Sequence, residues 1–316
     1  MANKNTASFV FTEVTNETGW DSNGVAWLVG LISAVYPFLG YDAACHLAEE
    51  VPHASRNVPL AMVGSVAMNG LIGLAYVIVL LFSTSSLSTL LETPTGFPFM
   101  QIYLDVTQSR AGALIMSLVP VLIATAANVA GLTSTSRTLY SFVRDSAVPF
   151  SSYLSHVDER THVPARSVVL VGALQILLGF IYIGSETAFN AVLSMAIIGM
   201  YASYLLPIVV MLLHGRQKLS TSDYGPFRLG RPLGIVLNLI SIAWMCLVIV
   251  FSTFPGSIPT TASTMNYSIV VMAGWLLFGF VYYLFSGRGK FQVPHFVTGS
   301  SNGVLTGVPV EVKASP

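Results

Sequence analysis

The stretch Tyr36-Pro37-Phe38-Leu39-Gly40-Tyr41-Asp42 interrupts an apolar segment that runs from about residue 24 to residue 47. The segment is long enough to cross a bilayer, which takes roughly 20 helical residues. However, Pro37 removes a backbone donor and crowds the preceding turn, and Gly40 permits dihedral angles outside the helical range. Asp42 adds a cost of about 3 kcal/mol at mid-membrane depth. We therefore predict two half-helices joined by unwound backbone.

Unwound backbone at membrane depth persists only where protein buries it or where it lines a wet cavity. We expect the first half-helix to end near Tyr36 with carbonyls that suit a cation. The second is expected to begin near Gly40, with amide donors and a positive dipole end that suit an anion. A zwitterionic ligand could use both. We predict substrate contacts from Tyr36, Pro37, Phe38, Leu39, Gly40, Tyr41 and Asp42; the alternative is a proline kink in which Asp42 only caps the second half-helix.

The composition indicates an integral membrane protein. Of the 316 residues, 53% are hydrophobic and 9% are charged, against a usual charged share of about 25%. Fourteen basic and fourteen acidic residues balance, so no nucleic-acid partner is expected. Both cysteines lie in apolar segments and are interpreted as packing residues rather than a disulfide or a metal pair. The sequence shows no nucleotide cradle, metal-ligand cluster or nucleophile and base, so we expect neither a cofactor nor an enzyme.

Seven apolar segments have the length of a membrane span. They cover approximately residues 24–47, 60–83, 111–135, 165–184, 188–213, 232–252 and 268–286. We predict an all-α integral membrane protein with about seven transmembrane helices in the lipid bilayer. Its expected domains are a polar outer segment over 1–22, a transmembrane domain over 23–287 and a disordered cytoplasmic tail over 288–316.

The basic residues predict the orientation, because Lys and Arg concentrate on the cytoplasmic side. One alternating set of connections contains twelve of the fourteen basic residues, and the other contains only Lys4 and Arg110. This places the N-terminus outside and the C-terminus inside. Since a polar tail without a signal sequence then lies outside, we expect that preceding spans are missing.

The third apolar segment contains a second group of candidate residues. Ala124 to Ser134 presents small and hydroxyl side chains along a helix, and we propose Asn128 and Thr133 as ligand or ion contacts. Close helix packing explains the Ala and Gly of this stretch equally well. His46 follows Asp42 by one turn, so a proton relay is conceivable; the alternative is a structural His at a helix end.

Several motifs resemble a known transporter family. Phe38-Leu39-Gly40-Tyr41-Asp42, continuing to Glu49-Glu50 and Arg56-Asn57-Val58-Pro59, resembles the sixth transmembrane helix and following loop of the amino acid–polyamine–organocation transporters. Thr93 to Phe99, and Ser136-Arg137 running to Arg144-Asp145 and Pro149, are similar to the fungal branch that contains choline, GABA and amino acid permeases. Together these similarities cover most of residues 20–290.

The resemblance implies a LeuT-like fold of inverted repeats: helices one to five, helices six to ten, then two more. It implies substrate binding between broken first and sixth helices, coupling to protons in many members, and the plasma membrane as the usual location. This chain would then be helices six to twelve, a C-terminal portion that lacks an N-terminal half.

We therefore predict a secondary permease for a small nitrogenous solute, namely an amino acid, GABA or choline. One alternative is an inactive or partner-requiring fragment. A seven-helix receptor is less compatible, because no span contains a Lys for retinal and a broken first span is unexpected in that class.

Overall fold

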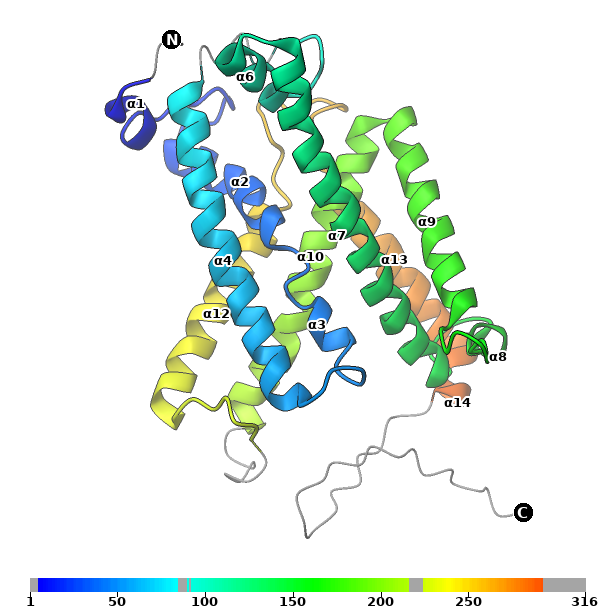
Figure 1. Ribbon diagram of the computed structural model, residues 1–316. Helices are drawn as coiled ribbons and strands as arrows, with labels where there is room; N and C mark the ends of the chain where they lie inside the picture. Colours follow the sequence, from blue (N-terminus) through cyan, green and yellow to red (C-terminus); the bar gives the residue numbers. More distant parts are fainter. Residues whose placement is uncertain (1–4, 85–89, 91, 216–223, 292–316) are drawn as a thin grey trace, which may run out of the picture.

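The computed structural model describes residues 5–84, 90, 92–215 and 224–291, and its regular elements within these ranges are helical (Figure 1). The short elements are α1 (Ala7–Phe11), α2 (Asn23–Val35), η1 (Tyr36–Phe38), α3 (Ala43–His46), α6 (Pro98–Thr107), α8 (Ser151–Leu154) and α14 (Arg288–Lys290). The long helices are α4 (Ala54–Ser83), α7 (Arg110–Arg144), α9 (Ala165–Gly184), α10 (Glu186–Val210), α12 (Arg231–Phe251) and α13 (Ser268–Tyr282). The π-helical turns η2 (Met211–Gly215) and η4 (Tyr283–Gly287) extend α10 and α13.

Six helices are long and apolar enough to span a membrane, which confirms the prediction of an all-helical, multi-pass membrane protein. The segment predicted over residues 24–47 differs from the other six. Its apolar helix is shorter, from Asn23 to Phe38, and the chain then leaves the helical path. Local chemistry explains this difference, because Pro37 and Gly40 fall in this segment and disfavour a continuous helix.

The third predicted span, 111–135, forms the larger part of one 35-residue helix, α7, which continues through Ser136 and Arg137 to Arg144. Helix α6, which begins with Pro98, was not predicted, because its residues lie in the connection between the predicted spans 60–83 and 111–135. Pro at the first helical position is favourable, since its missing N–H would have no intrahelical partner there.

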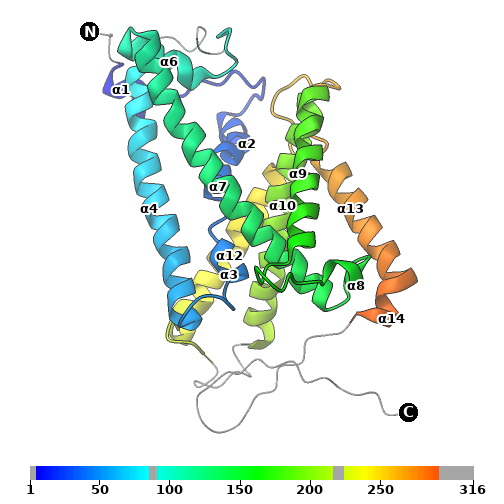
Figure 2. The same cartoon turned by 45° about the vertical axis from the view of Figure 1, so that its right-hand side comes forward.

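Helix α10 occupies the middle of the bundle and packs against α9, α12 and α13, while α7 packs against α6, α9 and α3 (Figures 1 and 2). The buried core near the broken segment consists of Val35, Ile197 and Val248, which are 4%, 0% and 2% exposed. These residues come from α2, α10 and α12. The core therefore fixes the first half of the broken segment to two membrane-spanning helices.

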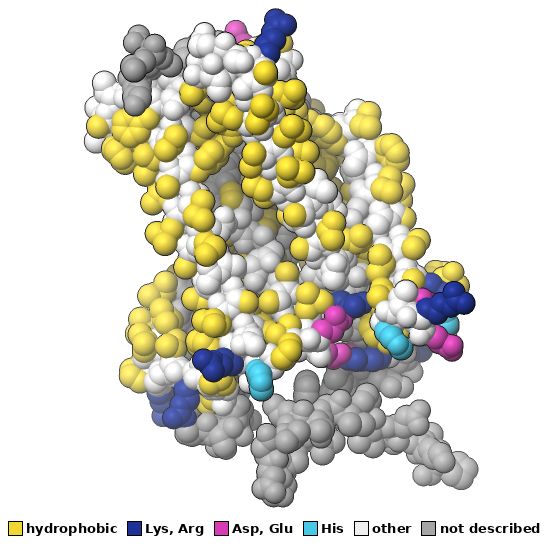
Figure 3. All heavy atoms as spheres, viewed as in Figure 1, with side chains coloured by type: hydrophobic (Ala, Val, Ile, Leu, Met, Phe, Trp, Pro, Cys, Tyr) yellow, Lys and Arg dark blue, Asp and Glu magenta, His cyan; other side chains and the backbone are white. Residues whose placement is uncertain are grey.

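The two ends of the bundle differ in charge. Figure 3 shows a hydrophobic band between the ends, and most of the charged side chains on that face gather at the end that holds α8 and α14. At the other end, the Asn5 side chain donates hydrogen bonds to the carbonyls of Leu81 and Thr84, and Ile258 N–H donates to Thr18 O. The predicted tail over 288–316 lies, from residue 292 onward, outside the described residues, as do Lys4, Arg216, Lys218 and Lys313.

Candidate functional site: a broken helix and an outer cavity

The interruption predicted from Pro37 and Gly40 is present. Helix α2 ends at Val35, the three-residue 3-10 turn η1 follows, and Leu39 is extended with ψ 144°. Gly40 has φ +89°, a conformation that L residues with a side chain rarely adopt. We call residues 36–42 the joint. The structure confirms that the chain is unwound at this point.

The extent predicted for the second half-helix is wrong. Helix α3 begins at Ala43 rather than near Gly40 and contains only four residues, after which the chain continues through turns to His53, whose φ is +51°. A helix macrodipole is the sum of many aligned peptide dipoles. Because α3 has so few, the positive helix end expected here is weak, and any attraction for an anion must come from individual N–H groups.

The joint contains several backbone groups without partners. Leu39 N–H donates to Tyr36 O at 3.0 Å, and Asn69 Nδ2 donates to Pro37 O at 2.9 Å. Within the described residues, no hydrogen bond is formed by three consecutive amides and two carbonyls of the joint: the N–H groups of Gly40, Tyr41 and Asp42, and the oxygens of Phe38 and Leu39. At membrane depth such groups need a partner. The joint therefore offers both donors and acceptors to a ligand.

Asp42 occupies the N-cap position of α3 but makes no capping hydrogen bond, so the capping alternative is wrong. Its carboxylate instead accepts a hydrogen bond from the Tyr204 hydroxyl, with 2.6 Å between Oη and Oδ2. His46 Nε2 lies 3.4 Å from the same oxygen. The Tyr41 and Tyr204 rings are also neighbours, with centroids 6.2 Å apart. Asp42 thus connects the joint to α10.

Tyr204 was missed by the sequence analysis, although a signal existed. The fifth predicted span contains Asn190, Ser194, Tyr201 and Ser203, polar groups that favour the bundle interior. Tyr204 lies on the same stretch and combines an aromatic ring with a hydroxyl that needs a partner when half-buried. Its partner could not be chosen from sequence, because Asp42 is 162 residues away.

Asn128 and Thr133 lie on α7, and the structure records no hydrogen bond between their side chains and the joint. Both residues are exposed in the described chain. The Thr133 hydroxyl donates to Val129 O at 2.9 Å within its own helix. Their predicted role as ligand contacts stays a prediction.

Two ion pairs connect the turn after α3 to the end of α7. Arg137 Nε lies 2.5 Å from Glu50 Oε1, and Arg144 Nη2 lies 3.5 Å from Glu49 Oε1. Arg137 is 18% exposed, whereas Glu50 is 55% exposed. The charged end of α7 is thus paired, as the sequence indicates, and its partners include the segment that follows the joint.

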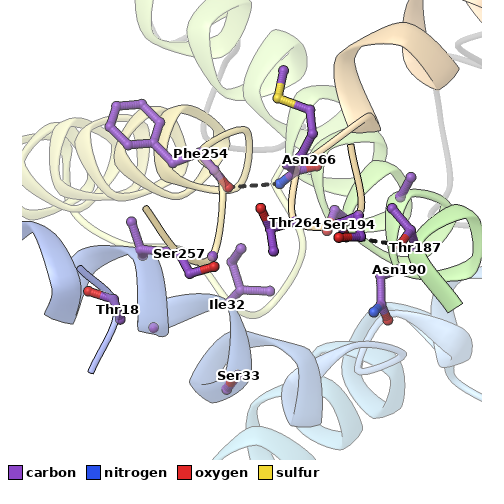
Figure 4. Close-up of a pocket in the computed structure, with 16 residues that line it drawn as sticks. Thr18, Ile32, Ser33, Thr187, Asn190, Ser194, Phe254, Ser257, Thr264 and Asn266 are labelled. Carbon is purple, nitrogen blue, oxygen red and sulfur yellow. Dashed lines mark hydrogen bonds between the residues drawn. The ribbon is translucent and has the colours of Figure 1, made fainter. Parts of the chain in front are cut away.

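A cavity of about 440 Å³ lies on the other side of the joint, between α2, the first turns of α10 and the connection from α12 to α13 (Figure 4). Its polar lining consists of hydroxyl and amide side chains: Thr18, Ser33, Thr187, Asn190, Ser194, Ser257, Ser263, Thr264 and Asn266. Asn266 is held by hydrogen bonds to the carbonyls of Ser252 and Phe254. The described side chains that line the cavity carry no charge.

Known proteins similar to this chain are permeases. It is 33% identical over 288 residues to the choline transporter of Saccharomyces cerevisiae, covering 91% of this chain and 50% of that protein. An amino-acid permease of Arabidopsis thaliana is 29% identical over 310 residues, which cover 95% of this chain and 58% of the relative. An amino-acid permease of Neurospora crassa is 27% identical over 291 residues, with 92% and 51% covered.

The chain spans about half the length of the curated relatives it matches. No solved structure matches it significantly. The family model described as amino acid permease matches residues 1–275, a range that contains the joint, Tyr204 and the outer cavity. This protein therefore belongs to the amino acid permease family.

Proposed function

We propose that this chain forms part of a secondary permease for a small nitrogenous solute, with the joint as half of the substrate site. The observation that carries the proposal is that, within the described residues, the N–H groups of Gly40, Tyr41 and Asp42 and the carbonyls of Phe38 and Leu39 have no hydrogen-bond partner. Backbone amides suit a carboxylate and backbone carbonyls suit an ammonium group. Amino acids, GABA and choline each present at least one group that the joint can bind. The names of the relatives mention choline and amino acids.

Within this proposal, residues Tyr36 to Asp42 contact the substrate, and Asn128 with Thr133 on α7 face the same pathway. The outer cavity next to α2 supplies the approach to the joint. Residues of α2 and α10 line this cavity, and the same two helices meet in the core formed by Val35 and Ile197. Transport then requires two states that open to opposite sides of the membrane and differ in population. Coupling to protons and location in the plasma membrane are further parts of this proposal.

We also propose that a further set of helices covers α7. Asn128 is exposed and makes no hydrogen bond within the described residues. An amide facing lipid at that depth is unfavourable, whereas an amide facing another helix finds a partner. The N-terminal half expected from the family resemblance would supply such helices, either in the same chain or in a partner chain.

The test is uptake of labelled GABA, choline and a panel of amino acids in cells without their own permeases. The chain is expressed alone and together with a five-helix segment corresponding to the first repeat of a relative. We expect saturable uptake above empty vector in at least one arrangement. Uptake in neither arrangement, with both polypeptides verified in the membrane, contradicts the proposal for these solutes.

Asp42→Asn provides the site-specific arm of this test. We expect it to reduce uptake at least tenfold, because the amide keeps the shape of the carboxylate and removes its charge. Asp158→Asn is the matched control, since Asp158 lies in a connection outside the spans and its carboxylate accepts hydrogen bonds from its own turn, at Thr161 and Arg160. Equal uptake by the parent and Asp42→Asn rejects a role for the charge.

A further inference from the structure

A surface that is both basic and apolar lies where α4 and α12 begin, at the end of the bundle that holds α8 and α14. Figures 1 and 2 both show the first turns of α4 and α12 next to each other at this end. The connection over residues 224–230 reaches α4, because a Cβ placed on Gly225 would lie 3.7 Å from Ser55 O. We call this surface the inner corner; its residues are Arg56, Phe227, Leu229 and Arg231.

The two arginines of the inner corner carry positive charge that the described residues do not balance. Their side chains are exposed and make neither an ion pair nor a hydrogen bond within that part of the chain. By contrast, Arg137 at the end of α7 is paired with Glu50, and Arg144 is paired with Glu49. Figure 3 shows Lys and Arg side chains over the beginnings of α4 and α12, with hydrophobic side chains beside them.

Exposed apolar side chains extend from the inner corner along both helices. In the connection, Phe227 and Leu229 are 55% and 50% exposed. On α4, Leu60 and Val63 are exposed and follow Arg56 by four and seven residues, so the three share a helix face. On α12, exposed apolar residues recur at helical spacing directly after the arginine: Leu233, Val236, Leu237 and Ile240. Each helix therefore combines an arginine at its inner end with an exposed apolar stripe.

This combination favours a ligand that has an anionic group next to apolar chains. Guanidinium groups bind phosphate through paired N–H donors. A soluble anion leaves the apolar stripes without a partner, whereas the acyl chains of a phospholipid cover them. Anionic phospholipids occur in the cytoplasmic leaflet, and the distribution of basic residues predicts that this end of the bundle is cytoplasmic. A phosphatidylcholine headgroup fits less well, because its own ammonium group cancels its net charge.

We propose that the inner corner binds the headgroup of an anionic phospholipid. Arg56 and Arg231 hold the phosphate, Phe227 and Leu229 lie at the level where headgroup and acyl chains meet, and the chains follow the apolar stripes of α4 and α12. A lipid held in this way bridges the beginnings of the two helices. The inference goes beyond the proposed transport function and does not depend on it.

The test measures lipid binding to the full chain, purified in a mild nonionic detergent. Native mass spectrometry compares the affinities for dioctanoyl phosphatidylserine and dioctanoyl phosphatidylcholine, which differ in net charge and share their acyl chains. We expect phosphatidylserine to bind about tenfold more tightly, because two arginines near a charged headgroup contribute roughly this preference after screening by salt. Inorganic phosphate, added at the same concentration as phosphatidylserine, should not displace it, since phosphate lacks acyl chains.

Two pairs of substitutions separate the inner corner from the overall charge. Arg56→Gln combined with Arg231→Gln should abolish the preference for phosphatidylserine and leave phosphatidylcholine binding unchanged. Arg160→Gln combined with Arg288→Gln is the matched control, because it removes the same charge from exposed arginines in the connection after α8 and in α14. This control should keep the preference of the parent. Circular dichroism that matches the parent verifies that each variant is folded.

A third pair, Phe227→Ser combined with Leu229→Ser, examines the apolar part of the site. It should weaken the binding of both lipids by a similar factor, because apolar contact area is lost while the arginines stay. A loss confined to phosphatidylserine would contradict the assignment of these two residues.

Three results overturn the lipid site. One is equal affinity of the parent for the two lipids. Another is an equal loss of preference in the control pair, which would assign the effect to the net charge of the chain. The third is displacement of phosphatidylserine by inorganic phosphate at the same concentration, which would indicate a site for the phosphate group alone. Since no solute is transported in this experiment, a failed lipid site does not disprove transport, and absent transport does not affect the lipid result.

Discussion

The two halves of the broken segment are held to the bundle by different forces. The first half, α2, is anchored by apolar packing of Val35 against Ile197 and Val248. The second half, from Asp42 to Glu50, is held by polar contacts to Tyr204, Arg137 and Arg144. Apolar burial is insensitive to pH and to moderate salt, whereas exposed ion pairs are screened and weak. We therefore infer that α2 is the fixed half and α3 the releasable half.

The largest expected effect is on the fixed half. Ile197→Ala removes a side chain that is 0% exposed and leaves a cavity between α2, α10 and α12, which costs roughly 2 to 4 kcal/mol of stability. Thermal unfolding in detergent micelles measures the loss. Ile176→Ala is the control, since Ile176 is 63% exposed on α9. Equal loss in both variants contradicts the assignment of Ile197 to the anchoring core.

The next effect concerns the joint between the halves. Gly40→Ala forces a side chain onto a backbone with φ +89°, although the added Cβ meets no atom within 4 Å. The expected cost of about 1 kcal/mol is therefore purely conformational.

Gly64→Ala is its matched control, because the Cβ there also meets open space but the backbone is helical. We expect that control to be neutral or stabilising by up to about 1 kcal/mol. Hydrogen exchange across residues 36–46 measures the change. Similar exchange in Gly40→Ala and the parent means that the joint tolerates a side chain.

A smaller effect is expected in the releasable half. Glu50→Gln leaves the mostly buried Arg137 guanidinium without its carboxylate. Because Glu50 is more than half exposed, solvent screens much of the interaction, and we expect a loss of about 0.5 to 1 kcal/mol. Hydrogen exchange should increase for residues 43–53 and stay unchanged for α2. Glu159→Gln is the control, because Glu159 is an exposed carboxylate outside these contacts. Faster exchange throughout α2 in Glu50→Gln would show that the two halves of the broken segment do not unfold independently.

The smallest effect is expected at the second ion pair. Arg144 and Glu49 are 44% and 80% exposed and their nearest charged atoms are 3.5 Å apart, so Arg144→Gln should cost less than about 0.5 kcal/mol. The same exchange experiment at low and high salt measures it. If exchange increases more in Arg144→Gln than in Glu50→Gln, the pair of Arg144 and Glu49 is the stronger of the two ion pairs.

Local features of the sequence predicted the fixed half well and the releasable half poorly. Pro37 and Gly40 act on their own backbone, so the interruption was visible without knowledge of the fold. The partners of the second half lie far along the chain: Tyr204 is 162 residues from Asp42, and Arg137 is 87 residues from Glu50. Pairing of this kind depends on how the helices pack. The same reason explains why the length of α3 was overestimated, since turns after His46 follow from these tertiary contacts.

The lining of the outer cavity was also predicted only in part. Asn190 and Ser194 were predicted to face the bundle interior, and both line the cavity. Their neighbours Thr18, Ser257 and Asn266 come from segments that the sequence analysis treated as outer connections. A cavity made where connections meet a helix has no periodic signal of its own, so its shape required the folded chain.

The joint also makes this segment sensitive to the thickness of the bilayer. The 13 residues of α2 and the three residues of η1 rise only about 25 Å, while the hydrocarbon core measures about 30 Å. The remaining depth is crossed by unwound backbone, which lengthens by roughly 2 Å for each residue that changes from helical to extended. A thicker membrane should therefore straighten the joint and a thinner one compress it, whereas the six continuous helices respond by tilting, by kinking or by deforming the bilayer around them. We therefore expect a change in lipid chain length to alter the joint before it alters the six long helices.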